Sequence, residues 1–131
     1  AGLEVCSGVI IGMGETWDDR IEMAMLLRDL PVVSVPVNIL VPIRGTRLEH
    51  RERMSCVDIL RCIALFRIIL GGKVMKIAAG RETVLHDFQA MGFSAGANGM
   101  LIGGYLTVKG RDVETDQRLI RDVRLMWESG L

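Results

Sequence analysis

The chain has 131 residues, 16 acidic and 16 basic side chains, and an apolar half, a composition that fits one globular domain with a sizeable core. Without a basic excess or a membrane-length apolar run, we expect neither nucleic acid nor a membrane as a partner. Three cysteines without a CxxC pair favour a reducing, cytoplasmic setting over a disulfide framework. The chain begins without methionine and runs directly into an apolar stretch, so we expect it to be part of a longer protein.

The first half of the chain reads as strand, helix, strand and loop. Residues 5–11 are mostly β-branched or aliphatic and predict a buried strand that ends on a glycine-rich turn. A helix capped by Thr16, with Asp19 returning the bond, runs to about residue 30, and a second strand covers 32–41. Pro36 suggests a bulge or bend in that second strand.

The second half repeats the alternation. The expected elements are a helix over 55–70, a strand over 73–79, a helix over 83–91, a strand over 100–102 and a helix over 112–127. In the helix over 83–91 we expect Leu85, Phe88 and Met91 to face inward.

Four strand–helix repeats predict an α/β fold with a parallel sheet covered by helices. A complete (β/α)8 barrel needs about twice this length, so four βα units fit half of a TIM-type barrel. A free-standing doubly wound sheet is the competing topology, but the first turn lacks a compact GxGxxG phosphate loop.

Five stretches together resemble biotin synthase, a family of radical S-adenosylmethionine enzymes. They are VCSGVIIGMGE at 5–15, SVPVNIL at 34–40, AGRE at 79–82, AGAN at 95–98 and GYLT at 104–107. The stretches follow the expected order over almost the whole chain. The resemblance implies that residues 1–131 are the C-terminal half of a radical-enzyme barrel domain, strands five to eight, including the biotin/thiamin-synthesis-associated region.

The resemblance also implies an activity. The family inserts sulfur into dethiobiotin to form biotin: a [4Fe-4S] cluster cleaves S-adenosylmethionine to a 5′-deoxyadenosyl radical, and a [2Fe-2S] cluster supplies the sulfur. The implied partners are dethiobiotin, the N-terminal half of the barrel and a second copy of the parent protein in a homodimer.

For the metal site, the resemblance assigns two residues. Cys6 matches a cysteine ligand of the [2Fe-2S] cluster. Lys76 stands where the family usually has an arginine as the unusual fourth ligand. An ammonium group has no lone pair, so we favour Lys76 as a nearby cation over Lys76 as a ligand.

For S-adenosylmethionine, Gly8, Ile10, Gly12 and Glu15 resemble the family's G-x-I-x-G-x-x-E segment. The resemblance places Ile10 against the adenine, and Val41 on the next strand matches a second adenine wall.

For the substrate, Asn38 matches an asparagine that hydrogen-bonds the ureido end of dethiobiotin. Its amide donors and carbonyl suit a urea. Thr107 aligns with the first of two threonines near the substrate carboxylate, but the second position is Val108 here. Arg81, in the turn after the third strand, is expected to pair with a carboxylate at the barrel rim.

The chain contains no CxxxCxxC motif, so it does not carry the ligands of the radical-generating cluster, and we expect it to be inactive by itself with no catalytic residue of its own. Two alternatives remain open. Gly103–Gly104 after the fourth strand is compatible with a phosphate-binding aldolase- or isomerase-like half-barrel. Exposed sheet edges are compatible with a self-associating, non-catalytic half-barrel.

Overall fold

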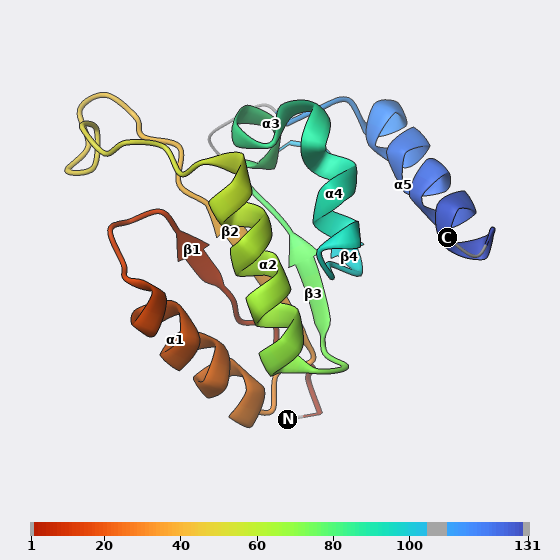
Figure 1. Ribbon diagram of the computed structural model, residues 1–131, viewed down its shortest axis with the longest axis horizontal. Coiled ribbons are helices and arrows are strands. Elements are labelled where there is room, and N and C mark those ends of the chain that lie inside the picture. The colour runs from red at the N-terminus through yellow and green to blue at the C-terminus, as the bar shows by residue number, and fades with distance from the viewer. Residues whose placement is uncertain (1, 105–109, 130–131) are drawn as a thin grey trace.

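The computed structural model describes residues 2–104 and 110–129 and contains a four-stranded, all-parallel sheet in the order β1-β2-β3-β4 (Figure 1). The strands are β1 (Val9–Ile11), β2 (Ser34–Ile39), β3 (Val74–Ile77) and β4 (Gly99–Met100). The helices are α1 (Trp17–Asp29), α2 (Cys56–Leu70), α3 (Arg81–Val84), the 3-10 helix η1 (His86–Phe88), α4 (Gln89–Ser94) and α5 (Val113–Glu128).

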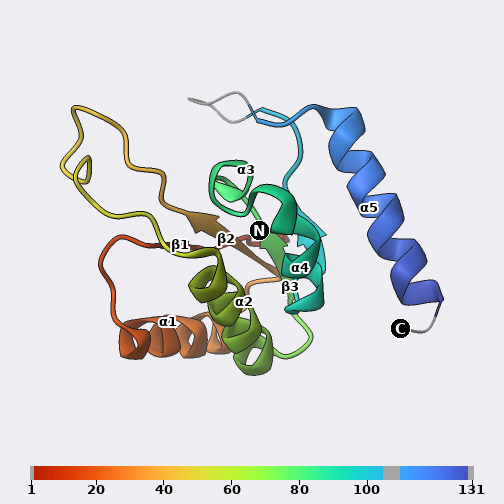
Figure 2. The ribbon, with the colours of Figure 1, turned by 45° about the horizontal axis from the view of Figure 1, so that its top comes forward.

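The predicted fold class is confirmed: strands alternate with helices, all strands are parallel, and the sheet is not closed, as in half of a TIM-type barrel. Helices α1, α2 and α4 lie together on one side of the sheet (Figure 2). Every second strand residue points to that side, and the core there contains Val9, Ile11, Val37, Ile39, Met75 and Ile77 from the sheet with Ala24, Leu27, Ile59, Ile63 and Phe66 from the helices.

Local capping signals are realised as predicted. The Thr16 side chain accepts the Asp19 backbone N–H at 3.2 Å, and the Asp19 carboxylate accepts the Thr16 N–H at 2.7 Å, which forms a complete capping box. Ser55 and Asp112 are the N-caps of α2 and α5, and each accepts a backbone N–H three residues along the chain. These bonds explain why the helices begin where the sequence predicts.

Of the bulge or bend expected at Pro36, the bulge is absent. The register between β1 and β2 is the same on both sides of the proline, from the Cys6–Ser34 bridge to the Val9–Val37 pair. Pro36 has no N–H to donate, so the β1–β2 ladder has a gap at this position and the strand continues without an extra residue.

The prediction of a single helix over 83–91 is wrong. The chain forms three short pieces, α3, η1 and α4, because His86 adopts a positive φ of 46° that no continuous helix accommodates. The helical phase therefore changes: Leu85 is fully buried, whereas Phe88 is 54% exposed and Met91 48% exposed. Phe93 replaces them as the buried aromatic residue.

The C-terminal part differs in smaller ways. Strand β4 is Gly99–Met100 rather than 100–102, although the Leu101 N–H still bonds the Ile77 carbonyl at 2.9 Å. Helix α5 stands away from the sheet and lies beside α4 (Figure 2). Within the described residues, no helix combines the length and apolarity that a membrane crossing requires.

Candidate functional site

Four of the predicted site residues lie in rows on one face of the sheet. A bridge pairs Cys6 with the start of β2, and Ile10 pairs with Asn38. Pro36, in the same row of β2 as Asn38, pairs with Lys76 of β3. Side chains alternate between faces along a strand, so Cys6, Ile10, Asn38 and Lys76 share the face opposite the helices.

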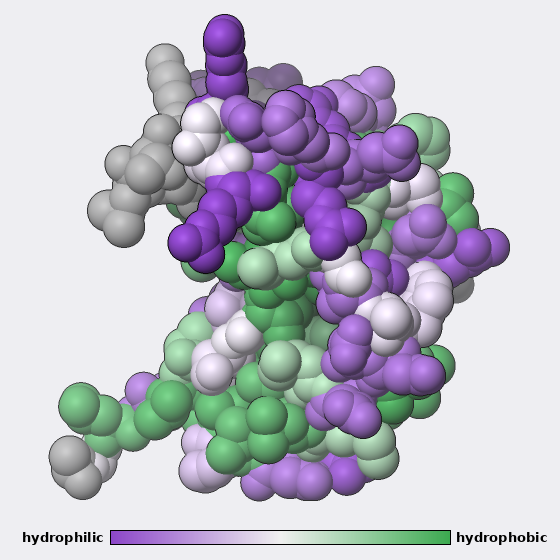
Figure 3. Space-filling view, turned by 90° about the vertical axis from the view of Figure 1, so that its left-hand side faces the viewer, coloured by the Kyte–Doolittle hydropathy of each residue, from purple (hydrophilic) through white to green (hydrophobic). Residues whose placement is uncertain are grey.

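This face is open in the described chain. Ile10 is 52% exposed, and Cys6 is exposed as well. Figure 3 shows the molecule hollowed on this side, with apolar residues at the floor of the hollow. The hollow is the inner surface of an incomplete barrel. In closed barrels of this type, side chains fill the interior, which can also hold a small bound group.

The three cysteines occupy different environments. Cys6 is an exposed thiol, and its Sγ lies 3.4 Å from the Ser34 hydroxyl oxygen. Cys62 is fully buried among core residues, and burial raises the pKa of its thiol to about 11. Cys56 is half-buried against the core. Of the three, Cys6 alone combines exposure with a position on the open face, so its sulfur is accessible to a group bound there.

The turn between β1 and α1 is organised by Glu15. Its carboxylate accepts the backbone N–H groups of Gly12, Met13 and Gly14 at 2.8, 2.7 and 3.1 Å, and Arg20 Nη2 lies 2.7 Å from it. Partial burial raises the pKa of Glu15, but the backbone and Arg20 hydrogen bonds outweigh it and hold that pKa below its usual value. Glu15 therefore holds the backbone of the glycine-rich turn in place through these hydrogen bonds.

Arg20 completes this turn from α1. Its guanidinium lies 4.5 Å from the centroid of the Trp17 ring and also contacts the Met54 sulfur at 3.8 Å. Gly12 and Gly14 have positive φ values of 91° and 113°, which glycine adopts without strain. The glycines are therefore required by the turn geometry itself.

Gly8, which was expected to border bound S-adenosylmethionine, lies against Pro36 of β2. A Cβ at this position would lie 2.0 Å from the Pro36 carbonyl oxygen and 2.7 Å from the Pro36 Cγ. The bare surface of Gly8 therefore admits the adjacent proline of β2.

Asn38 links the two neighbouring strands. Its Nδ2 donates to the Val9 carbonyl at 3.1 Å, and its Oδ1 accepts the Ala79 backbone N–H at 3.2 Å. These bonds use one amide hydrogen and one lone pair, so one donor and one acceptor position remain for another group. The amide orientation follows from this network.

The side chain of Lys76 lies over Gly99 of the neighbouring strand β4. Lys76 pairs with Gly99, and a Cβ on Gly99 would lie 2.9 Å from the Lys76 Cγ, so the lysine stem occupies the space that the glycine leaves. Within residues 2–104 and 110–129, the Lys76 ammonium has no hydrogen-bond or ion-pair partner. A half-buried cation without a partner is suited to a nearby anionic group.

Two predicted site residues lie elsewhere. Val41 follows the end of β2 and packs, half-buried, against the apolar core, outside the rows of the open face. Thr107 lies outside the described residues. Among the residues that are described, no three His, Cys, Asp or Glu side chains are grouped closely enough to hold a metal ion.

A buried polar cluster that sequence reasoning did not assemble lies behind the β3–α3 turn. Arg81 is fully buried and pairs with Asp116 at 2.5 Å and Glu82 at 3.1 Å, so its expected carboxylate partnership is confirmed. Gln89 also accepts from Arg81. The sequence marks Asp116 only as a favourably placed acid in the first turn of the last helix and gives no signal of its arginine partner.

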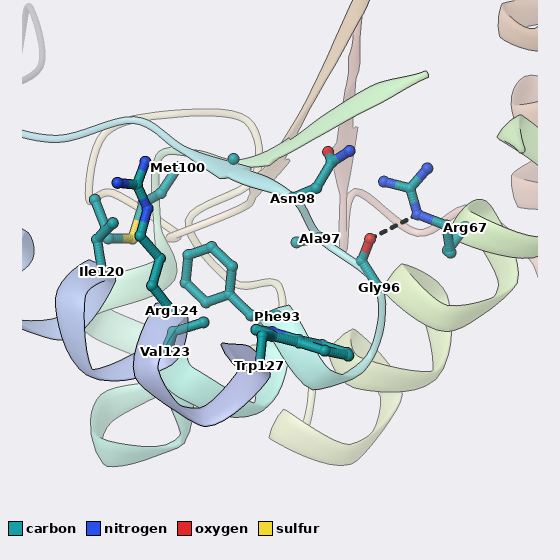
Figure 4. Close-up of a pocket in the computed structure, with 11 residues that line it drawn as sticks. Arg67, Phe93, Gly96, Ala97, Asn98, Met100, Ile120, Val123, Arg124 and Trp127 are labelled. Carbon is teal, nitrogen blue, oxygen red and sulfur yellow. Dashed lines mark hydrogen bonds between the residues drawn. The ribbon is translucent and has the colours of Figure 1, made fainter. Parts of the chain in front are cut away.

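A second hollow, of about 700 Å³, separates α5 from α4 and the start of β4 (Figure 4). Phe93, Val123 and Trp127 line it together with Arg67, whose Nε donates to the Gly96 carbonyl at 2.6 Å. Its lining includes none of Cys6, Ile10, Asn38 and Lys76, so it is separate from the candidate site on the open face.

Comparison with known proteins defines the class. The family model of the Biotin and Thiamin Synthesis associated domain matches residues 36–125, and the chain belongs to this family. Curated relatives carry the name biotin synthase: that of Carboxydothermus hydrogenoformans is 54% identical over 95% of this chain and 38% of its own length. That of Thermotoga petrophila is 56% identical over 93% of this chain and 41% of its own length.

The resemblance to biotin synthase is therefore confirmed. The biotin synthase of Clostridium acetobutylicum, 50% identical over 95% of this chain, is covered over 38% of its own length. The chain spans about two-fifths of the length of these relatives.

Proposed function

We propose that this chain is the C-terminal half of a biotin synthase barrel, strands five to eight, and that the complete protein inserts sulfur into dethiobiotin to form biotin. The observation that carries the proposal is the single open face on which Cys6, Ile10, Asn38 and Lys76 lie together. The identity of about one-half to relatives named biotin synthase favours this reaction over phosphate-barrel chemistry.

Cys6 would be one thiolate ligand of a [2Fe-2S] cluster. The fit is partial, since Cys6 is exposed on the correct face but the described residues hold no group of three candidate ligands. The other ligands would come from the rest of the protein. When bound, this cluster supplies the sulfur atom, and a [4Fe-4S] cluster with S-adenosylmethionine supplies the radical that activates the substrate carbons.

Lys76 would balance the negative charge of the thiolate-ligated cluster from the neighbouring strand. Its ammonium has no partner in the described chain, and the low dielectric of a closed barrel would strengthen that attraction. Asn38 would receive the ureido group of dethiobiotin with its remaining donor and acceptor positions. Thr107 would lie near the substrate carboxylate.

For S-adenosylmethionine, Ile10 would provide an apolar surface for the adenine, with Val41 as a second wall. The β1–α1 turn would border the cofactor, and Glu15 would act by holding the backbone of Gly12 in place rather than by direct contact. Gly8 would act by letting β2 approach β1. Keeping water away from the radical then depends on closing the open face.

This dependence explains why we propose that the segment has no activity by itself. The open face needs the N-terminal half of the barrel to complete it, and the radical-generating cluster needs ligands that this chain does not contain. We place the complete protein in the cytoplasm, where the ligand thiols stay reduced, and as a homodimer.

The test uses the complete protein, reconstituted anaerobically with iron and sulfide. We expect both clusters and the conversion of dethiobiotin to biotin. Cys6→Ser should lose the [2Fe-2S] absorption and biotin formation but keep cleavage of S-adenosylmethionine. Cys56→Ala is the matched control and should keep all three. Retention of the [2Fe-2S] cluster in Cys6→Ser would contradict the assignment.

A further inference from the structure

Arg81 binds four groups with one buried guanidinium. Its Nε donates to the Leu101 carbonyl at 3.2 Å, and its Nη2 contacts Asp116 at 2.5 Å and Glu82 at 3.1 Å. Its Nη1 donates to the Gln89 side chain. Glu82 is its neighbour in α3, and the other partners come from the end of β4, from α4 and from α5, so one side chain joins three further elements to the turn that carries it.

That turn is seated directly against the end of β2. The Ile39 N–H bonds the Ala79 carbonyl at 2.8 Å, and Gly80 takes a φ of 88° to pass over it. A Cβ on Gly80 would lie 2.1 Å from the Ile39 carbonyl oxygen, which leaves no clearance between turn and strand. A shift of Arg81 is therefore transmitted to Ala79.

Ala79 in turn orients a side chain of the open face. Its N–H donates to the Asn38 Oδ1 at 3.2 Å, so it fixes which end of the amide faces β3. The Val9 carbonyl holds the other end at 3.1 Å. Rotation of the amide would break both bonds, because each partner accepts or donates but does not do both.

We propose that Arg81 is a positioning residue for Asn38. Asp116 and Gln89 hold the guanidinium, the guanidinium holds the Ala79–Gly80 turn, and the turn sets the orientation in which the Asn38 amide meets the substrate. This inference rests on the proposed function, in which Asn38 binds dethiobiotin. A buried ion pair is a weak source of net stability, so geometry is the better reason for its presence here.

The experiment is a double-mutant cycle in the complete, reconstituted protein, read as KM and kcat for dethiobiotin. Arg81→Lys keeps the charge but cannot reach all four groups, and we expect KM to rise about tenfold with kcat nearly unchanged. Asn38→Ala should raise KM by at least as much. If Arg81 acts through Asn38, Arg81→Lys adds little in the Asn38→Ala background.

The outcomes separate positioning from mere stability. Asp116→Asn should resemble Arg81→Lys, with the iron content of the protein unchanged. Arg118→Lys is the matched control, because this exposed arginine on α5 pairs only loosely with Glu114 at 3.9 Å. An unchanged KM in Arg81→Lys, or effects of Arg81→Lys and Asn38→Ala that multiply, would overturn the proposal.

A readout without substrate separates this proposal from the proposed function. Hydrogen exchange of the Ala79 amide should be faster in Arg81→Lys and in Asn38→Ala than in the wild type, and unchanged in Arg118→Lys. If the wild type forms no biotin, the proposed function fails and the exchange experiment still decides the positioning role. Unchanged exchange at Ala79 in Arg81→Lys would overturn it.

Discussion

Pro36 lies directly beside Gly8, and its ring and carbonyl occupy the space in which a side chain at position 8 would stand. Gly8→Ala should therefore force β1 and β2 apart. We expect a loss of about 2 kcal/mol or more of unfolding free energy, since the clash involves backbone as well as a ring. Thermal or urea unfolding of the complete protein measures it. Gly72→Ala, with no atom within 4 Å of the new Cβ, should be nearly neutral.

Glu15→Gln tests the β1–α1 turn. Three backbone N–H groups and Arg20 bind the carboxylate, so we expect the neutral side chain to cost about 2 kcal/mol at neutral pH. Backbone and Arg20 hydrogen bonds hold the pKa of Glu15 below its usual value in the folded protein, so the carboxylate stabilises the fold fully above the unfolded-state pKa, and this stabilisation is lost as the pH falls through the folded pKa. The difference in melting temperature between wild type and Glu15→Gln should thus shrink in acid. A melting-temperature difference that does not change with pH would contradict the stabilising role of the ionised Glu15 carboxylate.

The thiols should differ in reactivity. In this 131-residue chain at pH 8, iodoacetamide should modify Cys6 rapidly, because this thiol is exposed. Cys62 should react only after unfolding, since it is fully buried and its pKa is raised to about 11. Peptide mass spectrometry gives the order. In the complete protein, assembly of the [2Fe-2S] cluster should protect Cys6, and a Cys6 that reacts equally fast with and without the cluster would count against ligation.

Lys76→Met separates the two roles considered for this side chain. Methionine keeps an unbranched stem over Gly99 but carries no charge and no amine. If Lys76 balances charge, the iron and sulfide content should match the wild type while the reduction potential of the cluster falls. Cluster absorption and redox titration measure these quantities. Loss of the cluster in Lys76→Met would instead indicate ligation by the amine.

Arg67 joins the end of α2 to two loops. Its guanidinium donates to the carbonyls of Gly71, Lys73 and Gly96 (Figure 4 shows the last of these bonds). Arg67→Lys cannot make all three, and we expect a loss of about 2 kcal/mol in unfolding experiments. Arg61→Lys, on the same helix but largely exposed beside Asp58, should change stability by less than about 0.5 kcal/mol.

The helix break near residue 88 is a feature of the fold that the sequence pattern did not predict. A continuous helix over 83–91 would have buried Phe88 and Met91, but the backbone breaks at His86 and exposes both. The periodicity of the sequence does not record the positive φ of His86. The contact between Gly8 and Pro36 could not be predicted from the sequence either, because the two residues are 28 positions apart.

Local signals determined much of the fold and part of the candidate site. The caps at Thr16 and Asp112 and the four apolar strands act over a few residues, so they can be read directly from the chain. Asn38 could be singled out because an amide in an apolar strand needs partners. Only the tertiary structure decided that Asp116 meets Arg81, 35 residues away, since such a contact depends on strand register and on how the loops return the chain.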